Sequence, residues 1–233
     1  LNAQPIHRQV GMTSIALAHN GNLTNTAELA EALDAEEGTS DSALMVEAIA
    51  SRVDDERSDA RGLEKAMLEA LPMFEGAFSL VVMDQGRIIG VRDPHGFRPL
   101  CLGELPDGAW ALASETAALD LVGAEFRRDV EPGEMIVIDA QGVRSLRPFA
   151  EQQPRLCVFE YVYFARPDSR LHGQTVHAAR RRMGSTLATE HPIDADVVVP
   201  VPESGIPAAQ GFSATSGIPY ADGLVKNRYI GRT

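Results

Sequence analysis

The sequence predicts a layered α+β domain with antiparallel sheets over residues 1–150, followed over 151–233 by the first part of an α/β domain. Three patterns lead to this prediction. Apolar residues recur at helical spacing in the first third of the chain, and strand-forming runs joined by turn residues come next. Beyond a Gln-Gln-Pro linker at 152–154, two runs that are apolar on both faces flank a helix.

The first third of the chain contains one predicted strand and three predicted helices. A β-prone run over 13–18 comes first. Asn25, with Glu28 three residues later, resembles a capping box and predicts a helix start. A second helix is expected from Asp41, and a third over 59–74, because apolar residues lie at four-residue spacing in both.

Strands are predicted for most of the remaining first domain, because β-branched and aromatic residues alternate with turn residues there. The segment Asp84 to Arg87 is a hairpin signal, and Ser114 is expected to cap a short helix that ends near Val122. Helices packed on hairpin-connected strands favour antiparallel layers. The expected strands span 77–83, 88–92, 99–104, 109–114 and 134–139.

The second domain is predicted from the apolar runs 157–164 and 196–202, which read as buried strands of a parallel sheet. Helices are expected over 175–189 and 206–214. A strand, a turn at Ser204-Gly205 and a helix form the beginning of a doubly wound fold. Such a turn presents N–H groups to an anion, although an ordinary β–α turn explains the same residues.

Charge and composition exclude several classes of function. Residues 1–150 carry 12 Lys and Arg against 25 Asp and Glu, and residues 151–233 carry 9 against 8, so no basic face for nucleic acid is expected. No apolar run approaches the roughly 18 residues of a membrane span, and no signal peptide opens the sequence. Two cysteines are too few for a disulfide framework. These features predict a cytoplasmic protein without a nucleic-acid or membrane partner.

Three segments contain residue types suited to chemistry. Asn20 and Gly21 follow an apolar strand, where a side-chain amide and a backbone N–H could both point at a developing oxyanion; a tight Asn-Gly turn explains the same pair. Asp41 could bind a substrate ammonium, although an N-cap explains this residue fully and is favoured by the spacing alone. Basic residues at 180–182, 226 and 228 could contact a phosphorylated small molecule, but a solvated helix face also accounts for the first cluster.

Seven motifs, in the same order along the chain, resemble the amidophosphoribosyltransferase family. The first four also resemble other class II glutamine amidotransferases, which are N-terminal-nucleophile hydrolases of layered αββα fold, and the last three resemble a phosphoribosyltransferase domain. The motifs are Asn2-Ala3-Gln4-Pro5, Leu17 to Asn25, Thr39-Ser40-Asp41, Arg92 to Leu100, Phe159 to Ser169, Pro200 to Gly205 and Val225 to Thr233.

This resemblance implies a reaction at two sites. The first domain would hydrolyse glutamine, and the ammonia would displace pyrophosphate from phosphoribosyl pyrophosphate in the second, giving 5-phosphoribosylamine and glutamate at the first step of de novo purine biosynthesis. Asn20 and Gly21 would be the oxyanion donors, and Asp41 would bind the glutamine ammonium. The resemblance also implies a cytoplasmic homo-oligomer inhibited by purine nucleotides.

Further residues are implicated at the second site by the same resemblance. Ser204 matches a position at the Mg²⁺ and phosphate end of the sugar substrate. Lys226 and Arg228 lie in a segment that matches the start of the loop closing over that substrate. Cys157 matches the first of four cysteines that bind a [4Fe-4S] cluster in one branch of the family.

The sequence departs from the family at the nucleophile. The family uses an N-terminal Cys whose own α-amine acts as the base, whereas residue 1 here is Leu. We therefore expect an internal piece of a longer enzyme, inactive by itself, in which a missing strand beside 13–18 leaves an open sheet edge. The alternative is a non-catalytic regulatory or scaffolding module that has lost its nucleophile.

Overall fold

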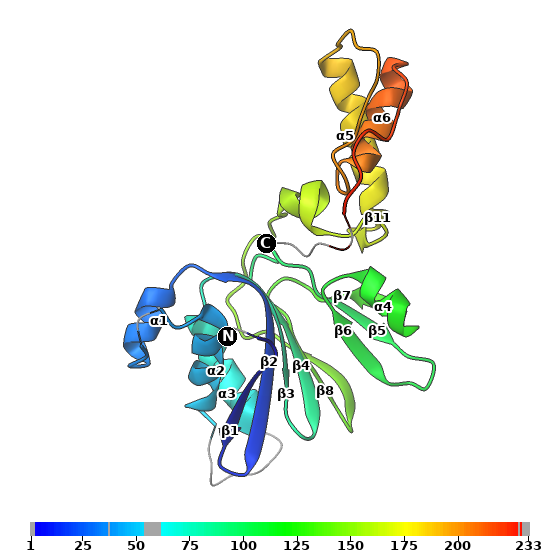
Figure 1. Cartoon of the computed structure of the whole chain (residues 1–233). Helices are drawn as coiled ribbons and strands as arrows, with labels where there is room; N and C mark the ends of the chain where they lie inside the picture. Colours follow the sequence, from blue (N-terminus) through cyan, green and yellow to red (C-terminus); the bar gives the residue numbers. More distant parts are fainter. Residues whose placement is uncertain (1–2, 37, 54–61, 228, 230–233) are drawn as a thin grey trace. The chain divides into compact units, whose positions relative to one another are not determined.

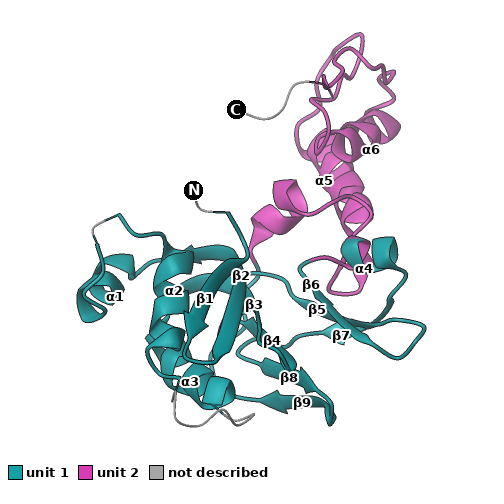
Figure 2. Ribbon diagram, turned by 60° about the horizontal axis from the view of Figure 1, so that its bottom comes forward, with its two compact units in different colours: residues 1–114, 118–156 teal, residues 115–117, 157–233 magenta. Residues whose placement is uncertain are grey.

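The computed structural model describes residues 3–36, 38–53, 62–227 and 229, which form two compact units (Figure 2). Unit 1 comprises residues 1–114 and 118–156, and unit 2 comprises residues 115–117 and 157–233. The division thus falls between Leu156 and Cys157. Among the described helices, none is both long and apolar enough to cross a membrane.

A six-stranded antiparallel sheet forms the centre of unit 1, in the order β1-β2-β3-β4-β8-β9 (Figures 1 and 2). Its edge strand β1 pairs with β2 from Ile6 opposite Leu17 to Val10 opposite Thr13. The prediction of an open edge beside 13–18 is therefore wrong. The strands are β1 (Ile6–Val10), β2 (Thr13–Leu23), β3 (Gly76–Met83), β4 (Arg87–Arg92), β8 (Met135–Asp139) and β9 (Gly142–Leu146).

Three helices cover one face of this sheet (Figure 1): α1 (Thr26–Ala32), α2 (Asp41–Ala50) and α3 (Gly62–Ala70), which continues into the 3-10 turn η1 (Leu71–Met73). Their predicted apolar faces are buried and form the main core against β2, β3 and β4. The capping box predicted at Asn25 is wrong, because this side chain bonds instead to Met73 O at 2.9 Å and Glu75 N at 3.2 Å.

A second, three-stranded sheet lies against the other face of the first. It consists of β5 (Cys101–Glu104), β6 (Trp110–Ala113) and β7 (Glu125–Asp129) in the order β6-β5-β7. Along β5 the side chains alternate: Leu102 packs into a core with Ile136 of the first sheet, whereas Cys101 packs against Leu119 of α4 (Thr116–Val122). The layers are therefore helix, sheet, sheet and helix, which confirms the layered α+β fold predicted for residues 1–150.

Unit 2 departs from its predicted strands. Residues 157–164 are not a buried strand, since Glu160–Phe164 form a π-helical turn, η2, in which Val162, Tyr163 and Phe164 are half exposed. The run 196–202 is likewise mostly exposed, and among the described residues its parallel pairing consists of one bridge between Val198 and Tyr220. A small hairpin of β10 (Arg170–Leu171) and β11 (Gln174–Thr175) precedes the long helix.

The two predicted helices of unit 2 are present as α5 (Val176–Glu190) and α6 (Ile206–Ser216) (Figure 1). They cross so closely that a Cβ on Gly211 would lie 2.0 Å from Arg181 O. Arg180, the first residue of the basic cluster, is 2 % exposed and donates to Tyr161 O at 2.5 Å and Ala165 O at 2.9 Å. This arginine therefore fixes the π-helical turn and is not part of a solvated face.

Candidate functional site

Asn20 and Gly21 lie inside strand β2, so the alternative interpretation of this dipeptide as a tight turn is wrong. Gly21 stands opposite Phe78 of β3. The backbone groups of Phe78 are engaged on the other side, because Phe78 N donates to Asp93 Oδ2 at 3.3 Å and Phe78 O accepts from Asp93 N at 2.9 Å. Pairs in an antiparallel ladder alternate between bonded and non-bonded. The N–H and C=O of Gly21 therefore point away from β3.

The N–H and C=O of Gly21 point to the edge of β2 that faces β1. Beyond Leu17 this edge is not paired with β1. Side chains bind the neighbouring N–H groups along this edge: His19 N donates to Gln4 Oε1 at 2.5 Å, and Leu23 N donates to Asp41 Oδ2 at 3.3 Å. The Gly21 N–H lies between these two on an exposed residue. A ligand with an acceptor oxygen can therefore reach it.

Only glycine fits at position 21. Its φ is +150°, and a Cβ there would lie 2.0 Å from Ala77 O and 2.7 Å from Phe78 Cα. Backbone in this region is essentially restricted to glycine. The close approach of β3 and the accessible N–H thus depend on the same missing side chain.

The Asn20 side chain is held in one orientation. Arg98 Nη2 donates to Asn20 Oδ1 at 2.6 Å, and Asn20 Nδ2 donates to Ser114 Oγ at 3.0 Å. Because a guanidinium only donates hydrogen bonds, it must face the amide oxygen and not the amide nitrogen. Asn20 Nδ2 carries a second hydrogen, which leaves a further donor at this end of β2.

A buried aspartate fixes the loop from which Arg98 reaches Asn20. Asp93 is fully buried, at 0 % exposure, directly after β4. A carboxylate that gathers several backbone donors fixes the loop around it. The Asp93 carboxylate accepts hydrogen bonds from the backbone N–H groups of Phe78 (3.3 Å), His95 (3.0 Å), Phe97 (3.1 Å) and Arg98 (3.0 Å). The motif from Arg92 to Leu100 is therefore the support of the site, which the sequence alone did not reveal.

Asp41 is the first residue of α2 and is not its N-cap. The cap is Ser40, whose hydroxyl accepts from Ala43 N at 3.3 Å, so the capping interpretation of Asp41 is wrong. The Asp41 carboxylate instead accepts from Leu23 N of β2 and, at 2.7 Å, from Ser42 N. A carboxylate in the first turn of a helix is stabilised by the helix dipole. The structure thus brings Asp41 to the same edge of β2 as Gly21.

His19 also lies at this edge of β2, beside Asp41, although the sequence did not single it out. Its side chain is 2 % exposed, and its Nδ1 lies 3.7 Å from Asp41 Oδ2. Burial lowers the pKa of His19 below the ordinary value of 6.5; Asp41 acts in the opposite direction, and Arg98 lowers the pKa further. The imidazole is therefore neutral at pH 7.

The residues predicted for the second site lie in unit 2. Ser204 is half buried in the turn before α6, and Lys226 Nζ lies 3.9 Å from Glu203 Oε2, beside Ser204. Arg228 falls outside the described residues. The Ser204 hydroxyl, the Glu203 carboxylate and the Lys226 ammonium therefore lie close together.

The residues present do not complete either predicted metal group. Mg²⁺ needs about six oxygen ligands, of which Ser204 and Glu203 supply only a part. A [4Fe-4S] cluster needs four thiolates, but the sequence has two cysteines. Of these, Cys101 is buried in unit 1 and donates to Ala113 O, and Cys157 is half buried in unit 2. Among the described residues no group of three or more His, Cys, Asp or Glu could hold a metal.

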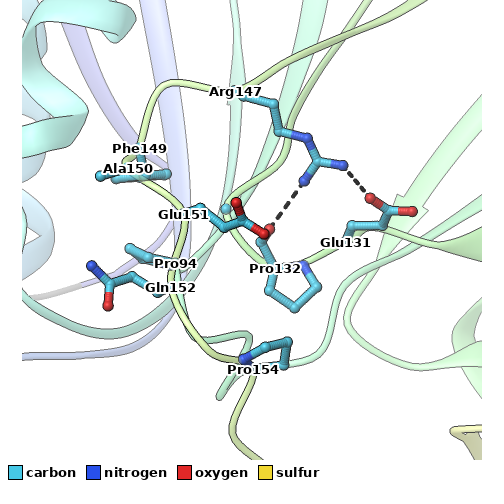
Figure 3. A pocket seen from close by; sticks show the side chains of 10 residues that line it. Pro94, Glu131, Pro132, Arg147, Phe149, Ala150, Glu151, Gln152 and Pro154 are labelled. Atoms are coloured by element: carbon cyan, nitrogen blue, oxygen red, sulfur yellow. Dashed lines mark hydrogen bonds and ion pairs between the residues drawn. The ribbon is translucent and has the colours of Figure 1, made fainter.

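A pocket of about 660 Å³ lies elsewhere in unit 1, and none of the candidate site residues described above lines it. Pro94, Pro132 and Phe149 form much of its wall (Figure 3). Arg147 also lines the pocket, but its guanidinium is already bonded to Glu131 and donates to Pro132 O at 3.0 Å. The pocket therefore adds no chemistry to the candidate site.

Known proteins resemble this chain along its whole length. Residues 1–121 match the family model described as a glutamine amidotransferase domain. Amidophosphoribosyltransferase of Mycobacterium tuberculosis is 52 % identical over 242 residues, which cover 100 % of this chain and 45 % of that protein. Amidophosphoribosyltransferase of Synechocystis is 49 % identical over 241 residues, again 100 % of this chain and 48 % of the relative.

A solved structure has the same fold. The glutamine phosphoribosylpyrophosphate amidotransferase from B. subtilis, complexed with ADP and GMP, superposes with a TM-score of 0.88 at 42 % identity. The match covers 99 % of this chain and 50 % of that one. The chain thus spans about half the length of the relatives it matches.

Proposed function

Because this chain belongs to the glutamine amidotransferase family, we propose that it is part of an amidophosphoribosyltransferase. Such an enzyme hydrolyses the side-chain amide of glutamine to glutamate and ammonia. The ammonia then displaces pyrophosphate from phosphoribosyl pyrophosphate, which gives 5-phosphoribosylamine. Unit 1 would contain the glutaminase site, and unit 2 would belong to the phosphoribosyltransferase site.

The observation that carries this proposal is the pair of donors at the end of β2. Acyl transfer develops negative charge on the amide oxygen of glutamine, and fixed hydrogen-bond donors lower the energy of that state. Asn20 Nδ2 and Gly21 N would supply the donors, because Arg98 fixes the first and the β2 edge presents the second. Asp41 would bind the α-ammonium of glutamine.

The nucleophile is not one of the two cysteines of this chain. Cys101 donates to Ala113 O inside the second sheet, and Cys157 lies in unit 2. An N-terminal cysteine, as the family uses, would attack the amide carbon, and its α-amine would take the proton. The amide nitrogen would leave as ammonia once protonated, and water would release glutamate from the acyl-enzyme.

The second site stays a broader proposal. Ser204, Lys226 and Arg228 would contact the phosphate end of phosphoribosyl pyrophosphate, and Mg²⁺ would be held mainly by substrate phosphates and water. Purine nucleotides are proposed as inhibitors, since the B. subtilis relative binds ADP and GMP. An iron–sulfur cluster bound through Cys157 and a homo-oligomeric assembly remain predictions, the first of which needs three further cysteines.

Asn20→Ala in the complete gene product tests the glutaminase site. Loss of one oxyanion donor lowers turnover by roughly 10²–10³, so glutamine-dependent synthesis should fall by this factor while ammonia-dependent synthesis persists. Asn22→Ala is the matched control, because Asn22 lies on the same strand and its side chain, among the described residues, bonds to the neighbouring Leu23 O at 2.8 Å. Equal loss of both activities in Asn20→Ala would make Asn20 a structural residue and refute the site.

A further inference from the structure

The His19 imidazole is buried with one nitrogen bonded and the other unpartnered. Nδ1 lies 3.0 Å from Ser42 Oγ, whereas Nε2 is buried and finds no hydrogen-bond partner among the described residues. A buried polar atom without a partner is destabilising, and native structures contain few of them. The arrangement at His19 therefore calls for a physical explanation.

The bonds around Ser42 determine which nitrogen of His19 bears the proton. Ser42 Oγ has one hydrogen, and the Asp41 carboxylate, with Oδ1 at 3.2 Å, is the charged acceptor for it. The hydroxyl must then accept from His19, so Nδ1 bears the hydrogen. The nearby Asp41 Oδ2, at 3.7 Å from Nδ1, favours an N–H there over a lone pair. Nε2 is left as a bare acceptor.

The same arrangement keeps His19 neutral. Protonation would place a hydrogen on buried Nε2, where no acceptor is found among the described residues. Asp41 at the start of α2 and Arg98 from the loop after β4 are the charged groups near the imidazole, and Gln4 approaches Ser42 Oγ at 3.5 Å without a charge. Burial and Arg98 outweigh Asp41, so the pKa of His19 falls.

We propose that His19 is a positioning residue for substrate recognition: its neutral Nδ1–H, acting through Ser42, orients the Asp41 carboxylate and leaves the charge of that carboxylate for the substrate ammonium. A protonated His19 would keep its Nδ1–H bond to Ser42, but its positive charge, 3.7 Å from Asp41 Oδ2, would compete with the ammonium for the carboxylate. Glutamine binding would then weaken as the pH falls. This inference rests on the proposed function, in which Asp41 binds the α-ammonium of glutamine.

Two isosteric substitutions separate the positioning role from a merely structural one. In His19→Asn the amide nitrogen takes the place of Nδ1 and does not titrate, whereas in His19→Gln it takes the place of Nε2. The bond to Ser42 is worth about 0.5–1.5 kcal/mol, so His19→Gln should raise the glutamine KM by roughly threefold to tenfold at pH 7.5. His19→Asn should keep that KM within about twofold. Ammonia-dependent turnover should be unchanged in both.

The pH profile gives the second readout, measured on the complete gene product from about pH 5 to 8. The glutamine KM of the parent enzyme should rise as the pH falls through the pKa of His19, which burial holds below 6.5, and His19→Asn should remove this rise. Nitrogen NMR of histidine-labelled protein should find the proton of His19 on Nδ1 and a bare Nε2. An unchanged KM in His19→Gln, a parent-like pH profile in His19→Asn, or a proton on Nε2 would each overturn the inference.

Asp41→Asn distinguishes failure of the inference from failure of the proposed function. If this variant binds glutamine normally, the ammonium site itself is misplaced, and the proposal for His19 falls with it. If Asp41→Asn raises the glutamine KM but the His19 variants behave like the parent enzyme, only the positioning role is refuted. Unfolding curves of each variant, compared with that of the parent, identify loss of folding as a cause.

Discussion

Arg98→Met should impair glutamine use by releasing the Asn20 amide. Arg98 Nη2 donates to Asn20 Oδ1 at 2.6 Å, a short bond whose donor is charged. Such a bond contributes about 1.5–3 kcal/mol. Without it the amide can rotate and turn its oxygen toward the developing oxyanion. If the whole contribution is lost in the transition state, glutamine-dependent turnover should fall by about tenfold to a hundredfold.

A double-mutant cycle tests this mechanism directly. At pH 8, where His19 is neutral, Arg98 should act mainly through Asn20, so Arg98→Met should have little further effect in the Asn20→Ala background. Arg127→Met is the matched control, because Arg127 pairs with Glu104 at 2.9 Å on the second sheet, away from β2. Multiplicative losses in the double variant, or an equal fall in ammonia-dependent turnover, would show that Arg98 does not act by orienting the amide.

Two further predictions concern stability. Gly211→Ala should destabilise unit 2 by about 1–3 kcal/mol or more, because its Cβ would lie 2.0 Å from Arg181 O; denaturant unfolding should find exposed Thr215→Ala, on the same helix, near neutral. Glu134 is 1 % exposed and bonds to Arg128 at 2.8 Å through both oxygens. Burial alone would raise the pKa of Glu134. The bonds from Arg128 and from the backbone lower it by more, so the pKa lies below 4.5. Its stabilisation should be complete above pH 4.5 and lost as the pH falls through the lowered pKa, a dependence that Glu134→Gln should abolish in unfolding titrations.

Local signals were sufficient for most of unit 1. The helices at Asp41 and near residue 62 and the hairpin at Asp84 follow from apolar spacing and turn chemistry, which act over a few residues. Strands β1 and β7 were missed because their sequences, IHRQV and EFRRD, are mostly polar and exposed. Both are edge strands, where pairing with a neighbour, and not an apolar face, determines the structure.

Unit 2 was harder because continuous apolar runs are ambiguous. The run from Cys157 to Phe164 fits a buried strand or a helical turn equally well by periodicity. Arg180 resolves the ambiguity, since its guanidinium binds the carbonyls of Tyr161 and Ala165 at the two ends of the turn. That contact joins positions far apart in sequence, and no local pattern indicates it. The basic cluster at 180–182 was for the same reason only partly interpretable.

The sequence could single out residue types for the candidate site, but not the tertiary contacts that support them. Asn20, Gly21 and Asp41 belong to short motifs with residue types that suit acyl transfer, and the structure brings all three to one end of β2. Arg98 and His19 were not singled out, because their roles depend on tertiary contacts. A signal existed in the motif that follows Arg92, where a buried aspartate before a Pro and a Gly is typical of a loop organised around a carboxylate.

The geometry at the β2 edge also favours a ligand site over a scaffolding module. A strand edge is most simply protected by pairing it, and a few more residues of β1 would cover Gly21. Instead, β1 stops opposite Leu17, and side chains from Gln4 and Asp41 bind the N–H groups on either side of Gly21. At the same edge, His19 is buried with an unpartnered nitrogen. Local departures of this kind cost stability and are concentrated at functional sites. A scaffolding module would not need these costly features. A ligand oxygen, in contrast, would accept from the Gly21 N–H as a neighbouring strand would.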